Sequence, residues 1–261
     1  MGGPREPELM PLPATSSTPV PRIWALVPCA GSGSRAAADM PKQYRSIAGK
    51  PLVLHTLTAL AQVERLALTL VAVAPDDAFL QAYAPASGMP WLCQPCGGAS
   101  RARTVANGLA ALEAHGATDD HWVLVHDGAR CLVSADLIDR LIDACLPDAV
   151  GGLLALPVSD TLKKAQAGRV LDSPDRMLHW LAQTPQMFRI GALRDALAAA
   201  GAEVTDEAAA MERAGFTPLL VAGSPSNFKV TWPEDFLVAE AVLMARQRQA
   251  GGGNERDYDY P

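Results

Sequence analysis

Alternation between two kinds of segment is the feature that most narrows the folds open to this chain. The strand-like apolar runs are residues 23–27, 66–74, 122–126 and 151–157, and the stretches of helical spacing are 52–63, 100–115 and 135–145. A run that is apolar at successive positions is typical of a strand buried on both faces, as in parallel sheets. The order therefore predicts an α/β fold, with a mostly parallel sheet covered by helices on both faces.

A glycine-rich turn follows the first apolar run directly. Gly31 and Gly33 come just after the strand-like segment that ends at Val27. Glycine adopts backbone angles closed to other residues and lets the main chain approach a ligand, so successive N–H groups can point at phosphate oxygens. Arg35 then supplies a planar guanidinium and Lys42 a compact ammonium group. Because ligands gather at the carboxyl ends of parallel strands, this stretch predicts a site for a nucleoside triphosphate.

Three other interpretations compete for the same turn. Gly31-x-Gly33-x-x-Ala36 fits the loose form of the dinucleotide fingerprint, but residues 50–55, about 20 positions further on, hold no carboxylate for a ribose. Gly49-Lys50 lacks the Ser or Thr with which a Walker loop meets magnesium. An ordinary strand-to-helix turn with solvated cations stays open on the turn alone.

Charge and cysteine content argue against two other classes of protein. A formal net charge of -6, with no polybasic stripe, argues against a general nucleic-acid surface. Five cysteines, an odd number, do not indicate a disulfide framework, which favours a reducing compartment such as the cytoplasm. Cys93-x-x-Cys96 has metal-ligand spacing, but the other cysteines form no second pair, so zinc is not favoured.

The two ends of the chain differ in composition from the rest. Residues 1–21 are rich in Pro, Ser and Thr, and residues 249–261 are polar after a run of glycines. Both are expected to be flexible extensions, and neither contains the apolar stretch of a signal peptide or membrane span. One folded domain is expected over residues 22–248.

Blocks spread over most of the chain resemble a single family. The first joins Ala30-Gly31-x-Gly33-x-Arg35 to Pro41-Lys42-Gln43-Tyr44. The later blocks are Gly97-Gly98 with Arg101, Val125-His126-Asp127-Gly128-Ala129-Arg130, Asp160-Thr161-Leu162-Lys163, Gln183-Thr184-Pro185-Gln186, Thr205-Asp206-Glu207-Ala208 and Lys229-Val230-Thr231. From about residue 22 to residue 247 the chain resembles the 2-C-methyl-D-erythritol 4-phosphate cytidylyltransferases. The resemblance implies a Rossmann-like fold of the nucleotidyltransferase type, with residues 22–248 as the cytidylyltransferase domain.

The reaction that the resemblance implies joins CTP to methylerythritol phosphate. A phosphate oxygen of the acceptor attacks the α-phosphorus of CTP, and pyrophosphate leaves. The product is 4-diphosphocytidyl-2-C-methyl-D-erythritol, in the non-mevalonate isoprenoid pathway. Because a phosphate monoester is already ionised near neutrality, the site must supply charge neutralisation and alignment rather than a strong base.

The resemblance also assigns roles to the matching positions. The catalytic pair that stabilises the triphosphate and the transition state is Arg35 and Lys42. The nucleotide would be bound by Ala30, Gly31, Gly33, Gly97, Gly98 and Thr104. Asp127, at the end of an apolar strand, would hold Mg²⁺ or another divalent cation, or orient the alcohol. The acceptor would be positioned by Arg176, Lys229, Thr161, Arg130, Thr184 and Thr205.

Residues 157–176 break the alternation and predict two short strands with a turn at Gly168. A free hairpin is only marginally stable, so it needs a surface to pack on. The resemblance implies an arm that embraces a second subunit, giving a homodimer in which Thr161 and Arg176 serve the neighbouring site. A loop folded on its own domain is the alternative.

A few positions depart from the family pattern, and two rival functions stay open. The departures are Cys29 and Ser34 in the glycine loop, Ala99 after the paired glycines, and Cys131 after Arg130. None of them removes a residue assigned to the reaction. A ribitol 5-phosphate cytidylyltransferase would share the loop and the CTP chemistry, but Lys163 and the block at 205–208 favour the methylerythritol enzyme. A non-catalytic nucleotide-binding homologue is disfavoured because the charged site residues are all present.

Overall fold

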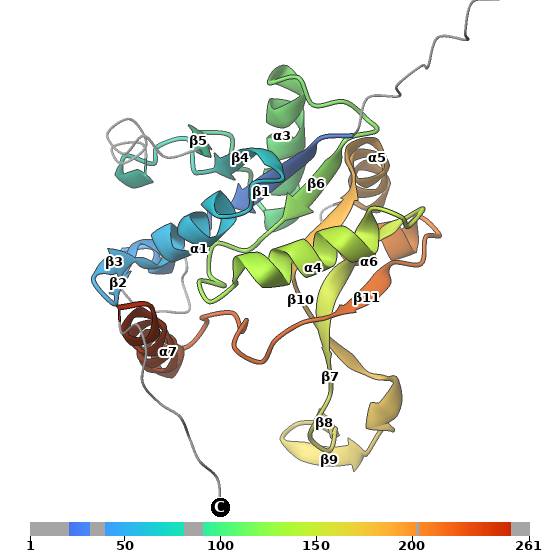
Figure 1. Cartoon of the computed structure of the whole chain (residues 1–261). Helices are drawn as coiled ribbons and strands as arrows, with labels where there is room; N and C mark the ends of the chain where they lie inside the picture. Colours follow the sequence, from blue (N-terminus) through green and yellow to red (C-terminus); the bar gives the residue numbers. More distant parts are fainter. Residues whose placement is uncertain (1–20, 32–39, 81–90, 202–203, 252–261) are drawn as a thin grey trace, which may run out of the picture.

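The computed structural model describes residues 21–31, 40–80, 91–201 and 204–251. In this part of the chain the centre is a seven-stranded sheet with the order β11-β7-β10-β6-β1-β4-β5 (Figure 1). Its strands are β1 (Ile23–Pro28), β4 (Leu66–Ala72), β5 (Trp91–Gln94), β6 (Trp122–Val125), β7 (Gly151–Pro157), β10 (Trp180–Arg189) and β11 (Leu219–Ala222). Residues 1–20 of the expected extension at 1–21, and residues 252–261 of the expected tail at 249–261, lie outside the described residues.

The prediction of a mostly parallel sheet is confirmed. Strand β1 pairs in parallel with β4 and β6, β4 pairs with β5, and β11 pairs with β7. Strand β10 lies between β6 and β7 and is antiparallel to both. Its ladder with β7 shifts register between Ala182 and Gln186, on either side of Pro185, which has no N–H to donate.

Helices cover both faces of the sheet, as predicted (Figure 1). One face packs against α1 (Leu52–Ala61) and α4 (Ala135–Cys145). The other packs against α3 (Arg101–Ala114), α5 (Ile190–Ala200) and α6 (Glu207–Arg213). The last helix, α7 (Pro233–Gly251), packs with residues 131–132 in a third apolar cluster and continues past residue 248, the expected end of the domain.

Strand β1 lies inside the sheet, between β6 and β4, and its side chains are apolar in both directions. Ala25 and Val27 face the cluster under α1 and α4, whereas Trp24 and Leu26 face the cluster under α3. Helix α3 approaches closely because it carries Gly108, where a Cβ would lie 2.5 Å from Leu26 Cδ1. Burial on both faces therefore fixes the strand whose end carries the glycine-rich turn.

Shorter elements follow the glycine-rich turn and form the predicted hairpin. Lys42–Tyr44 is a 3-10 turn, η2, and β2 (Ser46–Ile47) pairs with β3 (Lys50–Pro51) before α1 begins. The hairpin consists of β8 (Lys164–Gln166) and β9 (Arg169–Asp172), followed by the 3-10 turn η3 (Arg176–Leu178). It extends away from the sheet beyond the ends of β7 and β10 (Figure 1). The turn is at Gly168, as predicted, and the first of the two strands begins at Lys164.

The described residues include no helix that combines the length and apolar character needed to span a membrane.

Candidate active site

Two adjoining cavities lie where β1, β6 and β10 bring their polar residues together. The larger, of about 810 Å³, is lined by residues 28–31, 42–43, 98–101, 104, 127–129, 229 and 231. The smaller, of about 140 Å³, is lined by residues 101, 127, 130, 182–184, 186, 205–206 and 229. We call them the large cavity and the small cavity. The large cavity is at the carboxyl ends of β1 and β6, where the sequence predicts a ligand site.

The described part of the glycine-rich turn is held by Gln43. Its side-chain amide donates to the carbonyl oxygens of Cys29, at 3.1 Å, and of Gly31, at 2.9 Å. Gln43 itself is buried, so the residues after the turn act as its support. Gly33 and Arg35, which the sequence assigns to the nucleotide and to catalysis, lie outside the described residues.

Lys42 borders the large cavity from the same support. Its ammonium group donates to the carbonyl oxygen of Val230 at 2.8 Å, which ties η2 to the segment that carries Lys229. The predicted catalytic lysine is therefore in the wall of the cavity.

The paired glycines lie against the start of the glycine-rich turn. A Cβ on Gly97 would lie 2.3 Å from Ala30 Cβ and 2.8 Å from the Val73 carbonyl oxygen, so only glycine allows this approach. The N–H of Gly98 donates to Thr104 Oγ1 at 3.0 Å, and that hydroxyl donates to the Ser100 carbonyl oxygen at 3.0 Å. Thr104, expected at the nucleotide, lines the large cavity while its hydroxyl fixes the glycine segment.

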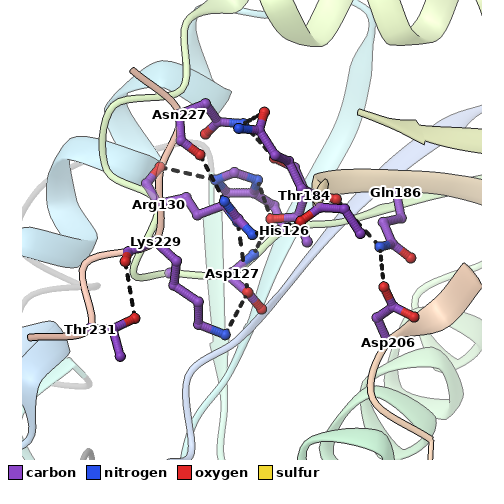
Figure 2. A network of polar contacts seen from close by, with 12 residues as sticks. His126, Asp127, Arg130, Thr184, Gln186, Asp206, Asn227, Lys229 and Thr231 are labelled. Atoms are coloured by element: carbon purple, nitrogen blue, oxygen red, sulfur yellow. Dashed lines mark hydrogen bonds and ion pairs between the residues drawn. The ribbon is translucent and has the colours of Figure 1, made fainter. Parts of the chain in front are cut away.

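Asp127 is the centre of a charged cluster immediately after β6. Its Oδ1 accepts from Arg101 Nε at 2.9 Å, and its Oδ2 pairs with Lys229 Nζ at 2.8 Å and, more distantly, with Arg130 Nε at 4.0 Å. Figure 2 shows Lys229 and Arg130 converging on this carboxylate. Burial alone raises the pKa of the Asp127 carboxyl, but Arg101 and Lys229 outweigh it and hold that pKa well below its usual range. The group is a carboxylate surrounded by cations.

His126 and Thr184 hold the main chain of Asp127 through hydrogen bonds. His126 Nε2 is 3.2 Å from the Arg130 carbonyl oxygen, which can only accept, so Nε2 carries the proton and Nδ1 accepts from the Thr184 hydroxyl at 3.1 Å. The same hydroxyl accepts from the Asp127 N–H at 3.0 Å (Figure 2). Burial lowers the pKa of His126 to about 4, so the ring is neutral near neutrality. The Thr184 hydroxyl is thus engaged within the protein, at the wall of the small cavity.

Arg130 is fixed by main-chain oxygens. Its Nη1 donates to the carbonyl oxygen of Asn227 at 2.8 Å and its Nη2 to that of Ala182 at 3.3 Å. The buried Asn227 amide in turn donates to the Thr184 carbonyl oxygen at 2.8 Å (Figure 2). Arg130 is therefore an ordered cation in the wall of the small cavity.

Arg101 and Glu207 are central to the cluster, although the sequence predicted no role for either residue. Both carboxylate oxygens of Glu207 accept from Arg101, with Nη1 at 2.7 Å and Nη2 at 3.0 Å. Both residues belong to the sequence blocks given above. An acid such as Glu207 is common in the first turn of a helix, where it interacts with the helix dipole, so its position in the sequence did not indicate that it is buried. The importance of Glu207 comes from its burial against Arg101, and only the folded structure shows that contact.

The structure brings together most of the predicted site residues. Those lining the large cavity are Ala30, Gly31, Lys42, Gly98, Thr104, Asp127 and Lys229, and those lining the small one include Arg130, Thr184, Thr205 and again Asp127 and Lys229. Gly97 supports the wall through its contact with Ala30. Thr161 and Arg176 lie on the exposed hairpin segment and line neither cavity. Arg176 there donates to the Ser159 carbonyl oxygen.

The described residues offer few protein ligands for a metal ion. No group of three or more His, Cys, Asp or Glu side chains suited to a metal ion occurs among the described residues. Among the described residues that line the large cavity, Asp127 is the one with a carboxylate, and Mg²⁺ commonly uses one or two carboxylates together with phosphates and water. All five cysteines are free, and Cys93 and Cys96 belong to no such group.

Comparison with known proteins identifies the family. Residues 23–245 match the family model described as 2-C-methyl-D-erythritol 4-phosphate cytidylyltransferase. The protein of that name from Paraburkholderia phymatum is 52% identical over 228 residues, which cover 85% of this chain and 96% of that protein. A crystal structure of 4-diphosphocytidyl-2C-methyl-D-erythritol synthase superposes with a TM-score of 0.76 and 39% identity, covering 85% of this chain and 98% of that one.

A longer relative matches as well. The bifunctional enzyme IspD/IspF of Albidiferax ferrireducens is 58% identical over 240 residues, which cover 92% of this chain and 56% of that protein. This chain therefore spans about half the length of that relative. The resemblance seen in the sequence blocks is confirmed, and the chain belongs to the 2-C-methyl-D-erythritol 4-phosphate cytidylyltransferase family.

Proposed function

We propose that this protein transfers the cytidylyl group of CTP to 2-C-methyl-D-erythritol 4-phosphate and releases pyrophosphate. The observation that carries the proposal is the wall of Arg101, Asp127 and Lys229 shared by two adjoining cavities. The large cavity has the volume of a site for a molecule of nucleotide size, and the small one suits a phosphate group. Two cavities that share a charged wall are what a reaction between two phosphates requires.

CTP would occupy the large cavity. Its base and ribose would contact the main chain of Ala30, Gly31, Gly33, Gly97 and Gly98, with Thr104 fixing that segment. Lys42, together with Arg35, would neutralise the triphosphate and the charge that moves to the leaving pyrophosphate. Asp127 would hold Mg²⁺ or another divalent cation, which supplies further charge neutralisation of the phosphates when bound.

The acceptor phosphate would bind in the small cavity. Arg130 and Lys229 would offset its repulsion by the triphosphate, and Thr205 would donate from the rim. Thr184 would act from behind, by holding the Asp127 main chain. An oxygen of the acceptor phosphate forms a bond to the α-phosphorus as the bond to the pyrophosphate oxygen breaks, and pyrophosphate departs with that electron pair. The acceptor is already ionised, so the chain has no proton to remove.

The hairpin formed by β8 and β9 is proposed to embrace a second copy of the chain. The exposed apolar side chains of Val170 and Leu171 in the hairpin, and of Met177 and Leu178 in the following turn η3, provide a surface for that contact. Arg176 and Thr161 would then reach the small cavity of the neighbouring subunit. We take the functional unit to be a homodimer in the cytoplasm, with residues 22–248 as its cytidylyltransferase domain.

Release of pyrophosphate from CTP tests this proposal. The assay uses the full chain with Mg²⁺ and supplies methylerythritol 4-phosphate or ribitol 5-phosphate in parallel reactions. We expect turnover with methylerythritol 4-phosphate. Turnover with ribitol 5-phosphate alone would favour the rival cytidylyltransferase, and CTP binding without turnover on either acceptor would favour a non-catalytic homologue.

A further inference from the structure

Arg101, a cation in the wall between the two cavities, is bound by Glu207, a residue that lines neither cavity. Arg101, Asp127 and Lys229 line the large and the small cavity alike. Arg101 comes from the start of α3, and Asp127 follows β6. Glu207, which binds Arg101, lines neither cavity.

Glu207 holds the guanidinium of Arg101 in a fixed plane. The Glu207 side chain is 1% exposed, and its two oxygens accept from Nη1 and Nη2 of Arg101 at 2.7 and 3.0 Å. The third bond of the same guanidinium, from Nε, goes to Asp127 Oδ1 at 2.9 Å. A planar fork bound at both ends has little freedom to rotate, so the Glu207 carboxylate restrains the Arg101 side chain where it contacts Asp127.

The start of α6 also forms the rim of the small cavity. Thr205 and Asp206 line it, and Asp206 caps α6 by accepting from the Ala209 N–H at 2.9 Å. The Gln186 side chain from β10 fastens the same turn, since it donates to Asp206 at 2.9 Å and accepts from the Ala208 N–H at 2.7 Å. Glu207, which follows Asp206 at this rim, therefore contacts Arg101 at the wall of the large cavity.

We propose that Glu207 is a positioning residue that, through Arg101, fixes Asp127 at the junction of the two cavities and so aligns the acceptor phosphate with the nucleotide. This role rests on the proposed function. The two carboxylates, Asp127 and Glu207, also limit the charge of the three cations Arg101, Arg130 and Lys229. Removing the charge of Glu207 leaves the wall more positive, which favours phosphate binding, while it releases the Arg101 side chain from its fixed plane.

The more positive wall should favour phosphate binding, whereas the released Arg101 side chain should lower the rate. Steady-state kinetics of Glu207→Gln measures both effects. We expect kcat to fall by at least about tenfold, because the reacting groups lose alignment. The KM for the acceptor is expected to stay the same or fall, because the added positive charge attracts the phosphate dianion. Glu207→Asp, which keeps the charge, should recover part of kcat. The matched control is Glu212→Gln, an exposed acid on the same helix, with kcat and KM within about twofold of the original protein.

Other outcomes overturn the role. If Glu207→Gln is folded and its kcat is within twofold of the original, Glu207 does not position the site. A raised acceptor KM together with a lower melting temperature would assign Glu207 to holding α6 in place, without a role in alignment. If Glu207→Gln does not fold, Arg101→Lys takes its place, because an ammonium group cannot bridge two carboxylates as a fork; retention of kcat in that variant overturns the proposal equally.

Binding of inorganic phosphate separates this inference from the proposed function. If the original protein shows no turnover, the proposed function fails, but the charge argument can still be measured by calorimetric titration with phosphate. Glu207→Gln is expected to bind phosphate roughly three- to tenfold more tightly at low salt, and Glu212→Gln unchanged. Equal affinity in Glu207→Gln and the original protein would overturn the inference.

Discussion

The main-chain N–H of Asp127 donates to the hydroxyl of Thr184 at 3.0 Å, and the same hydroxyl donates to His126 at 3.1 Å. A residue expected to touch the acceptor is thus bonded on both sides to the protein. Thr184→Val keeps the shape of the side chain and leaves two buried polar groups without partners. We expect a loss of about 1–3 kcal/mol in the free energy of unfolding, measured with denaturant, and a lower kcat.

Thr184→Ser is the matched control, since it keeps the hydroxyl. Its stability should be closer to that of the original protein than the stability of Thr184→Val. Equal stability in all three proteins would show that the hydroxyl does not support Asp127.

The buried ring of His126 predicts a dependence of stability on pH. Burial lowers its pKa from 6.5 to about 4, so between these values the unfolded chain binds a proton that the folded chain does not. The contribution is fully present above pH 6.5 and is lost as the pH falls towards 4, with a total on the order of a few kcal/mol. Denaturant unfolding of the original protein and of His126→Gln at several pH values measures the difference in slope.

Part of the slope belongs to other groups. Burial also lowers the pKa of His55, which contributes with the same sign, so His55→Gln is the appropriate comparison. The carboxylate of Asp127, with its lowered pKa, adds a loss of stability only below about pH 4. An identical slope between pH 6.5 and 4 in His126→Gln and the original protein would contradict the prediction.

The fold was predictable where burial follows the sequence pattern, and less so where polar residues are buried in pairs. Strand β1 and helices α3 and α4 were found from apolar runs and helical spacing. Strand β10 was not, because Gln183, Thr184, Pro185 and Gln186 interrupt its apolar residues. Those polar side chains are buried because partners distant in the sequence satisfy them, such as Ser224 for Gln183 and Asp206 for Gln186.

The same difference applies to the site. The sequence blocks predicted Asp127, Lys42 and Lys229 as site residues, and the structure brings all three to one cavity. The Arg101–Glu207 pair spans 106 positions of the chain, so no local pattern predicts it. Interactions of this kind depend on the packing of α3 against the sheet and on the start of α6, which only the fold supplies.

Lys42 is expected to be required for the reaction. Its ammonium group lies in the wall of the large cavity, 2.8 Å from the Val230 carbonyl oxygen. Lys42→Ala should lower kcat by on the order of a hundredfold or more, since it removes a charge that stabilises the transition state. Pyrophosphate release from CTP measures the rate. Lys50→Ala, an exposed lysine on β3, is the control and should keep kcat within about twofold.

Gly97 should be intolerant of any side chain. A Cβ there would lie 2.8 Å from the Val73 carbonyl oxygen, a main-chain atom, and 2.3 Å from Ala30 Cβ. Gly97→Ala must therefore displace either the paired glycines or the start of the glycine-rich turn. We expect at least about tenfold weaker binding of CTP, measured by calorimetry, with the fold retained. Ala110→Ser, at an exposed position of α3, should bind CTP as the original protein does, and unchanged binding by Gly97→Ala would contradict the prediction.

The proposed exchange of arms between subunits predicts complementation between two inactive variants. Lys42→Ala damages the nucleotide side of its own subunit, whereas Arg176→Ala removes a cation from the exposed hairpin segment and, in a dimer, from the partner's site. Each variant alone should be nearly inactive. Unfolding and refolding an equal mixture makes half of the dimers mixed, and each mixed dimer has one intact site, so about a quarter of the original activity should return.

The complementation experiment has a matched control and a clear alternative outcome. Arg169→Ala, which changes another exposed arginine of the hairpin, should keep its activity without a partner. If Arg176 acts within its own subunit, mixed dimers contain one site damaged at Lys42 and one damaged at Arg176, and no activity returns. Complementation therefore distinguishes an arm that serves the neighbouring site from a loop that serves its own, and it does so without requiring a measured dimer affinity.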